Sequence, residues 1–480
     1  MRALLASSIG VVCATALALP LTVQAGAAQV PDPTGADKPP TTVRARTQAA
    51  QPRGQAAPDS AASVSGSTQS LPLTPLDRSR PSTTTGNGRP AAELDTRPLA
   101  GARNGRPAAE AGTGPSSAGP QVRGVAPRVV RPFSLLGAVW DDPAADLHGR
   151  VQVRTRAVGS HRWSAWQELE THNDDAPDAD SPERRGPRAH GSTIPLWVGD
   201  SDGVQARVLT GKGAEPLPAG LRLDLIDPGK GAGTSRGLDR TPEPPTPEEE
   251  TVQQALQGEL SELDPSGLEE ADMAAAGHPF VGPRPPIITR AGWGADESLR
   301  GRQFSYNKTV KAAFIHHSGT GNNYTCAQAP ALLRSIYRYH VKTNGWRDFG
   351  YNFAIDKCGN IYEGRAGGVA RAVQGAHTLG FNTDSMGIAV LGTYSKANPP
   401  KAAVNAIAKL TAWKLGLFDV NPRSTTTMVS GGSNKYRKGT KVKLRVISGH
   451  RDGFATDCPG NRLYGRLGTT RTHAAGLQGR

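Results

Sequence analysis

Two residues near the carboxyl end of the chain are of the types that bind zinc. His450 and Cys458 lie close together in a glycine-rich segment that closes with Pro459-Gly460. Zinc takes imidazole nitrogen and thiolate sulfur in tetrahedral geometry, so this pair could hold the metal. Two ligands do not complete a site. The best candidate for a third lies far upstream, where an apolar run ends in the pair His316-His317.

The number of candidate ligands bears on what the metal would do. Structural zinc sites usually have four protein ligands, whereas catalytic sites have three and leave one position open for water. The sequence offers His316, His450 and Cys458, and it has none of the closely spaced cysteine pairs of zinc fingers. Zinc held in this way lowers the pKa of its water to about 7 and polarises a carbonyl. Three candidate ligands favour a catalytic site over a structural one. His317 is the alternative to His316 as a ligand.

Length and composition limit what kind of protein this is. A chain of 480 residues is typical of two or three domains. Only 36% of the residues are hydrophobic and 5% aromatic, whereas 57 are Gly and 39 are Pro. These proportions cannot supply a packed core along the whole length, so long disordered stretches are expected. The formal net charge of +14 favours an anionic partner, whether nucleic acid, membrane or an acidic wall polymer.

Residues 1–25 have the pattern of a signal peptide. A positive Met1-Arg2 precedes a run of small and apolar residues, and Val23-Gln24-Ala25 matches the small-residue pattern before a cleavage site. A membrane anchor is the alternative, but the apolar run is short and breaks at Pro20. We therefore expect a secreted, extracellular protein associated with the cell wall. Its mature form would have no nucleic-acid partner and no membrane span.

Export makes the cysteine count informative. Of 4 Cys, Cys13 falls in the predicted signal peptide, which leaves Cys326, Cys358 and Cys458. In an oxidising compartment, an odd number leaves one thiol for a role other than pairing within the fold. We assign a disulfide to Cys326 and Cys358 and keep Cys458 as the metal thiolate. Two free buried thiols are the alternative for the pair.

Changes in composition divide the mature chain. Residues 26–127 are rich in Pro, Ala and Gly and are predicted to be a disordered spacer, and residues 229–284 form a second linker rich in Pro and Glu. Between them, residues 128–228 contain short β-branched or aromatic segments, which are typical of a small β-sandwich-like module. Its predicted strands are 135–140, 151–156, 163–169, 194–198, 204–209 and 221–226.

The tryptophans of this module have two possible roles. Trp140, Trp163, Trp166 and Trp197 could form a surface that stacks on sugars. Filling the core of a small β domain is the commoner role for such residues.

Residues 285–480 have the pattern of strands that alternate with helices. This order predicts an α/β domain with a mixed sheet flanked by helices. Helices are predicted over 326–342 and 401–417, each with apolar residues at helical spacing on one face. The predicted strands are 311–316, 351–356, 360–362, 386–391 and 443–448.

A series of motifs runs in order through this last domain. They are Arg290-Ala291-Gly292-Trp293-Gly294-Ala295, Phe314-Ile315-His316-His317-Ser318, Gly345-Trp346, Gly350-Tyr351-Asn352-Phe353, Tyr362-Glu363-Gly364-Arg365, Gly375-Ala376-His377, Asn382, Ser385-Met386-Gly387-Ile388, Gly449-His450-Arg451-Asp452 and Cys458-Pro459-Gly460. In this order they resemble the peptidoglycan recognition protein family, which belongs to the type 2 N-acetylmuramoyl-L-alanine amidases. The long leader and tryptophan-rich module resemble those of secreted actinobacterial members.

The resemblance implies roles for individual residues. Zinc would be bound by His316, His450 and Cys458. Tyr351 would lie beside the metal and polarise the scissile carbonyl or stabilise the oxyanion. Thr456 matches the amidase-active members of the family, and non-amidase members typically lack the cysteine ligand. Ala389 stands where related cytoplasmic amidases carry a glutamate, so no carboxylate base comes from that strand.

Four further residues are candidates for contacts with a muropeptide. They are His317, Trp346, Arg365 and His377. Each has a plainer alternative: Trp346 could only pack, Arg365 could only form an ion pair, and His317 and His377 could be structural.

The resemblance and the residues together predict a secreted zinc-dependent N-acetylmuramoyl-L-alanine amidase. It would hydrolyse the amide between the lactyl group of N-acetylmuramic acid and L-alanine of peptidoglycan. A non-catalytic peptidoglycan-binding module with structural zinc is the alternative. A zinc endopeptidase is the weaker possibility, because the sequence contains no His-Glu-x-x-His motif. The basic charge adds anionic wall polymers as candidate partners.

Overall fold

The computed structural model describes residues 66–76, 123–171, 175–210, 215–230 and 277–480. The predicted signal peptide, most of the predicted spacer and most of the linker lie outside these residues. We call residues 66–230 the β module and residues 277–480 the C-terminal domain. Together they confirm the predicted order of an all-β part followed by an α/β part.

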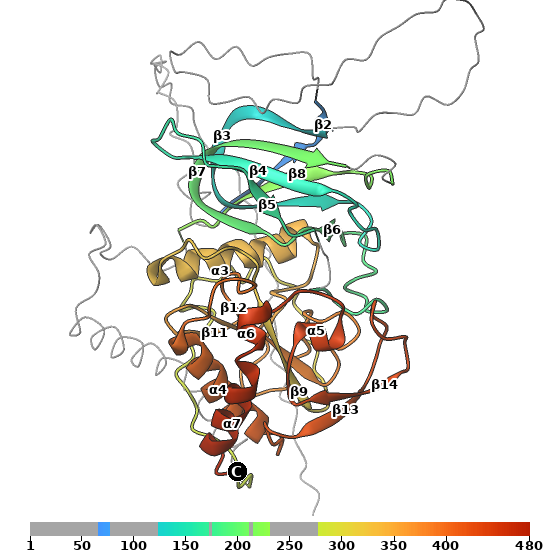
Figure 1. Cartoon of the computed structure of the whole chain (residues 1–480), viewed down its shortest axis with the longest axis vertical. Coiled ribbons are helices and arrows are strands. Elements are labelled where there is room, and N and C mark those ends of the chain that lie inside the picture. The colour runs from blue at the N-terminus through green and yellow to red at the C-terminus, as the bar shows by residue number, and fades with distance from the viewer. Residues whose placement is uncertain (1–65, 77–122, 172–174, 211–214, 231–276) are drawn as a thin grey trace, which may run out of the picture. The chain divides into compact units, whose positions relative to one another are not determined.

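The β module is an antiparallel sheet organised by two long strands. β3 (Arg123–Trp140) pairs with β7 (Leu196–Leu209), and shifts in their register mark irregularities of the kind that bend a strand. β4 (Arg150–Ala157) buries every second residue, as its alternating sequence predicts. The remaining strands are β1 (Ser67–Pro72), β2 (Thr74–Pro75), β5 (Gln167–Leu169), β6 (Gly191–Ser192) and β8 (Arg222–Asp227). The sheet follows the order β1-β8-β3-β7-β4-β5, with β2 and β6 also on β3 (Figure 1).

The prediction of a spacer through residue 127 is wrong at two places. β1 pairs with β8 and places Leu71 opposite Leu223, and β3 already begins at Arg123. β1 was missed because its Ser, Thr and Gln residues show no apolar period. Its stability comes from pairing with a strand at the far end of the module.

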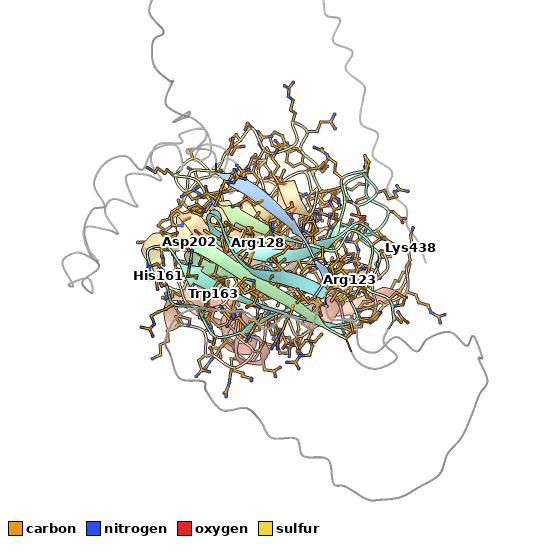
Figure 2. All side chains as sticks on the ribbon, turned by 90° about the horizontal axis from the view of Figure 1, so that it is seen from above. Arg123, Arg128, His161, Trp163, Asp202 and Lys438 are labelled. Carbon is orange, nitrogen blue, oxygen red and sulfur yellow. A yellow bond between two sulfur atoms is a disulfide. The ribbon has the colours of Figure 1, made fainter. Side chains whose placement is uncertain are left out.

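The tryptophans of the β module divide between two environments. Trp140 and Trp197 are buried, as expected for core residues. The rings of Trp163 and Trp166 instead lie 5.3 and 5.2 Å from the guanidinium carbon of Arg154, so both rings make cation–π contacts with this arginine. Figure 2 shows Trp163 near the rim of this module.

The C-terminal domain is built on a mixed sheet in the order β11-β10-β12-β9-β15. Four of its strands are parallel, and β11 is antiparallel at one edge. The parallel strands are β9 (Ala312–His317), β10 (Phe353–Ile355), β12 (Ser385–Val390) and β15 (Ile447–Gly449), and the edge strand is β11 (Ile361–Glu363). The predicted mixed sheet is therefore confirmed.

Helices cover both faces of this sheet. α4 (Lys401–Gly416) and α7 (Leu467–Leu477) share a buried cluster with Ile315 and Ile388, whereas α3 (Ala329–Arg338) packs with Ala354 and Ala389 on the other face. Both predicted helices are confirmed, and the predicted strand 443–448 is divided between β14 (Lys441–Arg445) and β15. The remaining elements are η1 (Cys326–Gln328), η2 (Tyr339–Thr343), β13 (Thr425–Val429), β14 (Lys441–Arg445), α5 (His450–Gly453) and α6 (Asn461–Tyr464).

The face of α3 away from the sheet packs against the β module. Leu332 and Ile336 of α3 belong to one buried cluster with Leu135 and Trp197. Just beyond α3, the Tyr339 hydroxyl donates a hydrogen bond to the Thr193 carbonyl at 3.1 Å. This apolar contact holds the β module beside the residues that follow β9.

The disulfide between Cys326 and Cys358 is confirmed, and it joins the start of η1 to the turn between β10 and β11. Replacing both cysteines by alanine should lower the free energy of unfolding by about 3–4 kcal/mol, because the unfolded chain loses the cross-link that closes this loop. Urea denaturation of the metal-free protein measures the change. Reducing the wild type should give a similar loss, and a loss below about 1 kcal/mol would contradict a stabilising role.

Candidate metal centre and substrate groove

The site begins at the carboxyl end of β9. Side chains alternate along a strand, so Phe314 and His316 face one side of the sheet and Ile315 and His317 face the other. β15 lies parallel to β9 and ends at Gly449. The short helix α5 begins at the next residue, His450, with Gly449 as its N-cap. Parallel neighbours end at the same edge of a sheet, and this brings the two predicted histidine ligands together. Their ring centroids are 4.5 Å apart.

Cys458 completes the predicted set from the loop that follows α5. Its Sγ lies 3.7 Å from Nδ1 of His316, and the thiol is fully buried outside any disulfide. The next residue, Pro459, follows a cis peptide bond. The three predicted ligands therefore converge, although they come from separate elements.

A fourth residue joins them from the β module. Asp175 places Oδ1 at 2.8 Å from Nδ1 of His316 and at 3.1 Å from Nδ1 of His450. One ligand atom from each of Asp175, His316, His450 and Cys458 can be chosen so that all lie within 4.8 Å of one another. Among the described residues, Nε2 of His450 is buried without a hydrogen-bond partner, and the printed contact of its Nδ1 is the 3.1 Å approach to Asp175 Oδ1. Buried polar atoms left in this way fit a zinc ion, which accepts this set of donors.

Protonation states in the site also suit a metal. Burial lowers the pKa of His316 to about 4, so its imidazole is neutral at pH 7. Burial would raise the pKa of Asp175, but the neighbouring His450 and His316 outweigh it and hold that pKa well below the usual value. A neutral imidazole and an ionised carboxylate are the forms that bind zinc.

Behind His316 lies a hydrogen-bonded chain that orients the ring. Nε2 of His316 is 3.3 Å from Nδ1 of His377 and 3.3 Å from Oγ1 of Thr378. If Nδ1 of His316 faces the metal, Nε2 carries the proton and donates it in one of these bonds. His377 can then donate from Nε2 to Ser385 Oγ, at 3.4 Å. Such partners fix the tautomer and the direction of a ligand. His377 was predicted to contact the substrate, but its side chain is fully buried within this series of hydrogen bonds.

The two predicted catalytic residues take different positions. The Tyr351 hydroxyl donates to Oδ2 of Asp175 at 3.2 Å, and its ring centroid is 5.2 Å from that of His316. Tyr351 therefore lies beside the candidate metal ligands. The Thr456 hydroxyl accepts the Cys458 backbone N–H at 3.3 Å, so it supports the loop that carries Cys458.

The other predicted substrate residues already have partners. Trp346 stacks on His340 at 4.6 Å and packs with Ala176. Both terminal nitrogens of Arg365 bond to Glu183, at 2.8 and 3.1 Å. His317 points to the side of the sheet opposite His316 and accepts the Tyr394 backbone N–H at 3.3 Å.

Sequence reasoning missed Asp175 and Glu183. Both belong to the β module, outside the stretch that carries the family motifs, and the acidic residues of 174–183 have the composition of a solvated loop. Asp452, two residues after His450 in the same motif, has a structural role. It caps α5 by accepting the Gly449 N–H and also accepts the Tyr464 hydroxyl.

Comparisons with known proteins show which family the chain resembles. Residues 306–461 match the family described as N-acetylmuramoyl-L-alanine amidase. Peptidoglycan-recognition protein SC2 of Drosophila melanogaster is 30% identical over 185 residues, which are 38% of this chain and 85% of that protein. The chain belongs to the peptidoglycan recognition protein family. It is also 31% identical to the human N-acetylmuramoyl-L-alanine amidase over 218 residues, 44% of this chain and 32% of that protein.

The β module matches a family of its own. Residues 81–232 match the family described as Rv3811 N-terminal galactose-binding domain-like, so the match begins before the predicted start at 128. Among solved structures, wild-type Drosophila PGRP-LB is 26% identical with a TM-score of 0.31, and covers 38% of this chain and 92% of that one. The match to the amidase family, over residues 306–461, lies within the C-terminal domain.

The hydrogen-bonded chain behind His316 can be tested through metal affinity. Replacing His377 by alanine should weaken zinc binding about 10–100-fold, because His316 loses a partner that fixes its tautomer. Competition with a fluorescent zinc chelator measures the affinity. His340→Ala is the matched control, since His340 is another buried histidine but bonds the Gly350 N–H. Equal losses in the two variants would show that His377 contributes only to packing.

Proposed function

We propose that this chain is a zinc-dependent N-acetylmuramoyl-L-alanine amidase that hydrolyses the lactyl–L-alanine amide of peptidoglycan. The observation that carries the proposal is the convergence of His316, His450 and Cys458 beside the Tyr351 hydroxyl. Membership of the family supports the substrate class. The retained cysteine supports hydrolysis.

In this reaction water adds to the lactyl carbonyl carbon, the carbon–nitrogen bond breaks, and the L-alanine nitrogen leaves as an amine after taking up a proton. Bound zinc would supply Lewis acidity to activate the water and polarise the carbonyl. Tyr351 donates a hydrogen bond to the oxyanion of the tetrahedral intermediate. Thr456 assists by holding the Cys458 loop in place.

A second candidate is a peptidoglycan-binding protein whose zinc is structural. Asp175 favours it, because it would give the metal four protein ligands, the number usual in structural sites. The two functions differ in whether stem peptides are released from the wall.

We also propose that the protein is exported and acts at the cell wall. The signal-peptide pattern of residues 1–25 and the net charge of +14 support this location, and anionic wall polymers would attract the basic chain. Within the described residues, no helix is both long and apolar enough to cross a membrane.

The hydrolytic function is tested on isolated peptidoglycan. Wild-type chain and an Asp175→Ala variant, which frees the position beside the metal ligands, are each incubated with the wall, with and without a zinc chelator. We expect chelator-sensitive release of stem peptides with a free L-alanine amino group, detected by mass analysis. Cys458→Ser in either background should abolish release. Retention on the wall without release by any chain would favour the binding protein.

Tyr351 can be tested by removing only its hydroxyl. Tyr351→Phe should lower kcat about 100- to 1000-fold, because the oxyanion loses a donor, while zinc affinity stays unchanged. Steady-state kinetics with a soluble muropeptide measures the effect. Tyr362→Phe is the control, since the Tyr362 hydroxyl donates to Asp356 on the edge of the sheet. A Tyr351→Phe enzyme with near wild-type kcat would remove Tyr351 from the catalytic residues.

A further inference from the structure

One segment of the β module crosses the metal centre and the surface around it. It comprises residues 175–190, lies between β5 and β6, and contacts the C-terminal domain along its length. The contacts fall on the residues expected to receive the substrate.

The segment enters at Asp175, whose side chain is almost completely buried. Its Oδ1 faces both histidine ligands, and its Oδ2 accepts the Tyr351 hydroxyl at 3.2 Å. The carboxylate thus occupies the two positions that hydrolysis would need, the open side of the metal ligands and the hydroxyl that would stabilise the oxyanion.

The next residues are bound by backbone and amide groups. Asn382 Nδ2 donates to the Ala176 carbonyl and to Asp178 Oδ1, each at 2.9 Å. Asp178 also accepts the Gly380 N–H at 2.7 Å. Ala176 is fully buried against Trp346. These bonds hold the segment as a specific ligand would be held.

Further along, Glu183 neutralises the buried Arg365. It accepts two hydrogen bonds from that guanidinium in a bidentate pair and a third from the Arg347 N–H at 2.9 Å. Burial would raise the pKa of Glu183, but Arg365 outweighs it and the pKa is lowered. An anionic group of a ligand would have to displace Glu183 to reach Arg365.

The end of the segment covers Gly345-Trp346. The His190 N–H donates to the Asn344 carbonyl at 3.2 Å, and a Cβ added to Gly345 would lie 1.7 Å from the Arg188 carbonyl oxygen. A cavity bordered by Asp175, Tyr351 and Trp346 has a volume of about 20 Å³, enough for about one water molecule. A muropeptide cannot enter while the segment is in place.

We infer that Asp175 is a fourth, displaceable ligand of the metal and that residues 175–190 are a built-in competitor of the substrate, so that this conformation is the inhibited form of the enzyme. The inference rests on the proposed function, since it assigns the covered surface to the muropeptide. Activation then requires the segment to leave the groove.

A catalytic role for Asp175 is the rival explanation. A general base must have room for water and substrate beside it, and here both carboxylate oxygens face protein groups while the following residues fill the groove. A base would be needed for turnover, whereas a competitor suppresses it. The two roles therefore predict opposite effects of removing the carboxylate.

The inference is tested with a double variant, Asp175→Ala with Glu183→Ala, in the full chain. Binding of N-acetylmuramoyl-pentapeptide to metal-free protein is measured by calorimetry, so no turnover is needed. We expect binding at least about tenfold tighter than in the wild type, because a competitor that holds most molecules closed weakens the apparent affinity by the fraction left open. Glu168→Ala with Asp202→Ala is the matched control, since these carboxylates pair with Arg150 and Arg156 within the β module. It should bind as the wild type does.

A second measurement addresses Asp175 as a ligand. The visible absorption of the cobalt(II)-loaded Asp175→Ala chain should differ from that of the wild type, and its zinc should be lost to a chelator at about tenfold lower concentration. The Glu168→Ala, Asp202→Ala control should match the wild type in both. Identical spectra and zinc retention in Asp175→Ala and wild type would overturn the ligand assignment.

The outcomes separate the inference from the amidase proposal. Tighter muropeptide binding with no release from the wall would support the inhibitory segment and reject hydrolysis. Equal affinities, including no binding by any chain, would overturn the inhibitory segment, as would weaker binding by the double variant. Release by the wild type that is lost in Asp175→Ala would support an amidase in which Asp175 acts as the base, and would likewise overturn it.

Discussion

Burial of the His316 imidazole is the constraint on which the rest of the site depends. A fully buried imidazole is held neutral, and it needs a partner for each ring nitrogen. One nitrogen has His377 and Thr378 behind it, and the other faces Cys458 and Asp175. The parallel pairing of β9 with β15 adds His450, because it fixes where α5 begins. The apolar sheet thus provides a buried position whose donor atoms suit a metal ion.

Much of the C-terminal domain could be predicted from the sequence alone. The apolar run before His316, the glycine-bounded His450 and the lone third cysteine carry local signals, and the structure brings all three together. The disulfide was predicted from the expected oxidising compartment and the number of cysteines. In the β module less was visible. β3 and β7 are long and irregular, so β3 was predicted only over its buried end, 135–140, and β7 as two shorter pieces, 194–198 and 204–209.

The groove shows why the rest could not be predicted. Asp175 and Glu183 act only where the chain brings them against His316 and Arg365, far away in sequence. Nothing in their local sequence distinguishes them from neighbouring acidic residues that face solvent, such as Asp180, which pairs with the exposed Lys438 (Figure 2). The net charge of +14 predicts an anionic partner for the chain as a whole, whereas the buried Arg365 pairs with Glu183 of the same chain.

The histidine pair at the end of β9 bears on how the two parts of the chain evolve. His316 meets Asp175 on one face of the strand, and on the other Nε2 of His317 lies 3.7 Å from a carboxylate oxygen of Glu170. Both carboxylates come from one short stretch of the β module. They contact β9 of the C-terminal domain from its two opposite faces. Exchanging this module for another in a gene fusion would remove the carboxylate partners of both histidines and of Arg365 at once. The two parts are therefore expected to descend together as one unit, and not to be shuffled as independent cassettes.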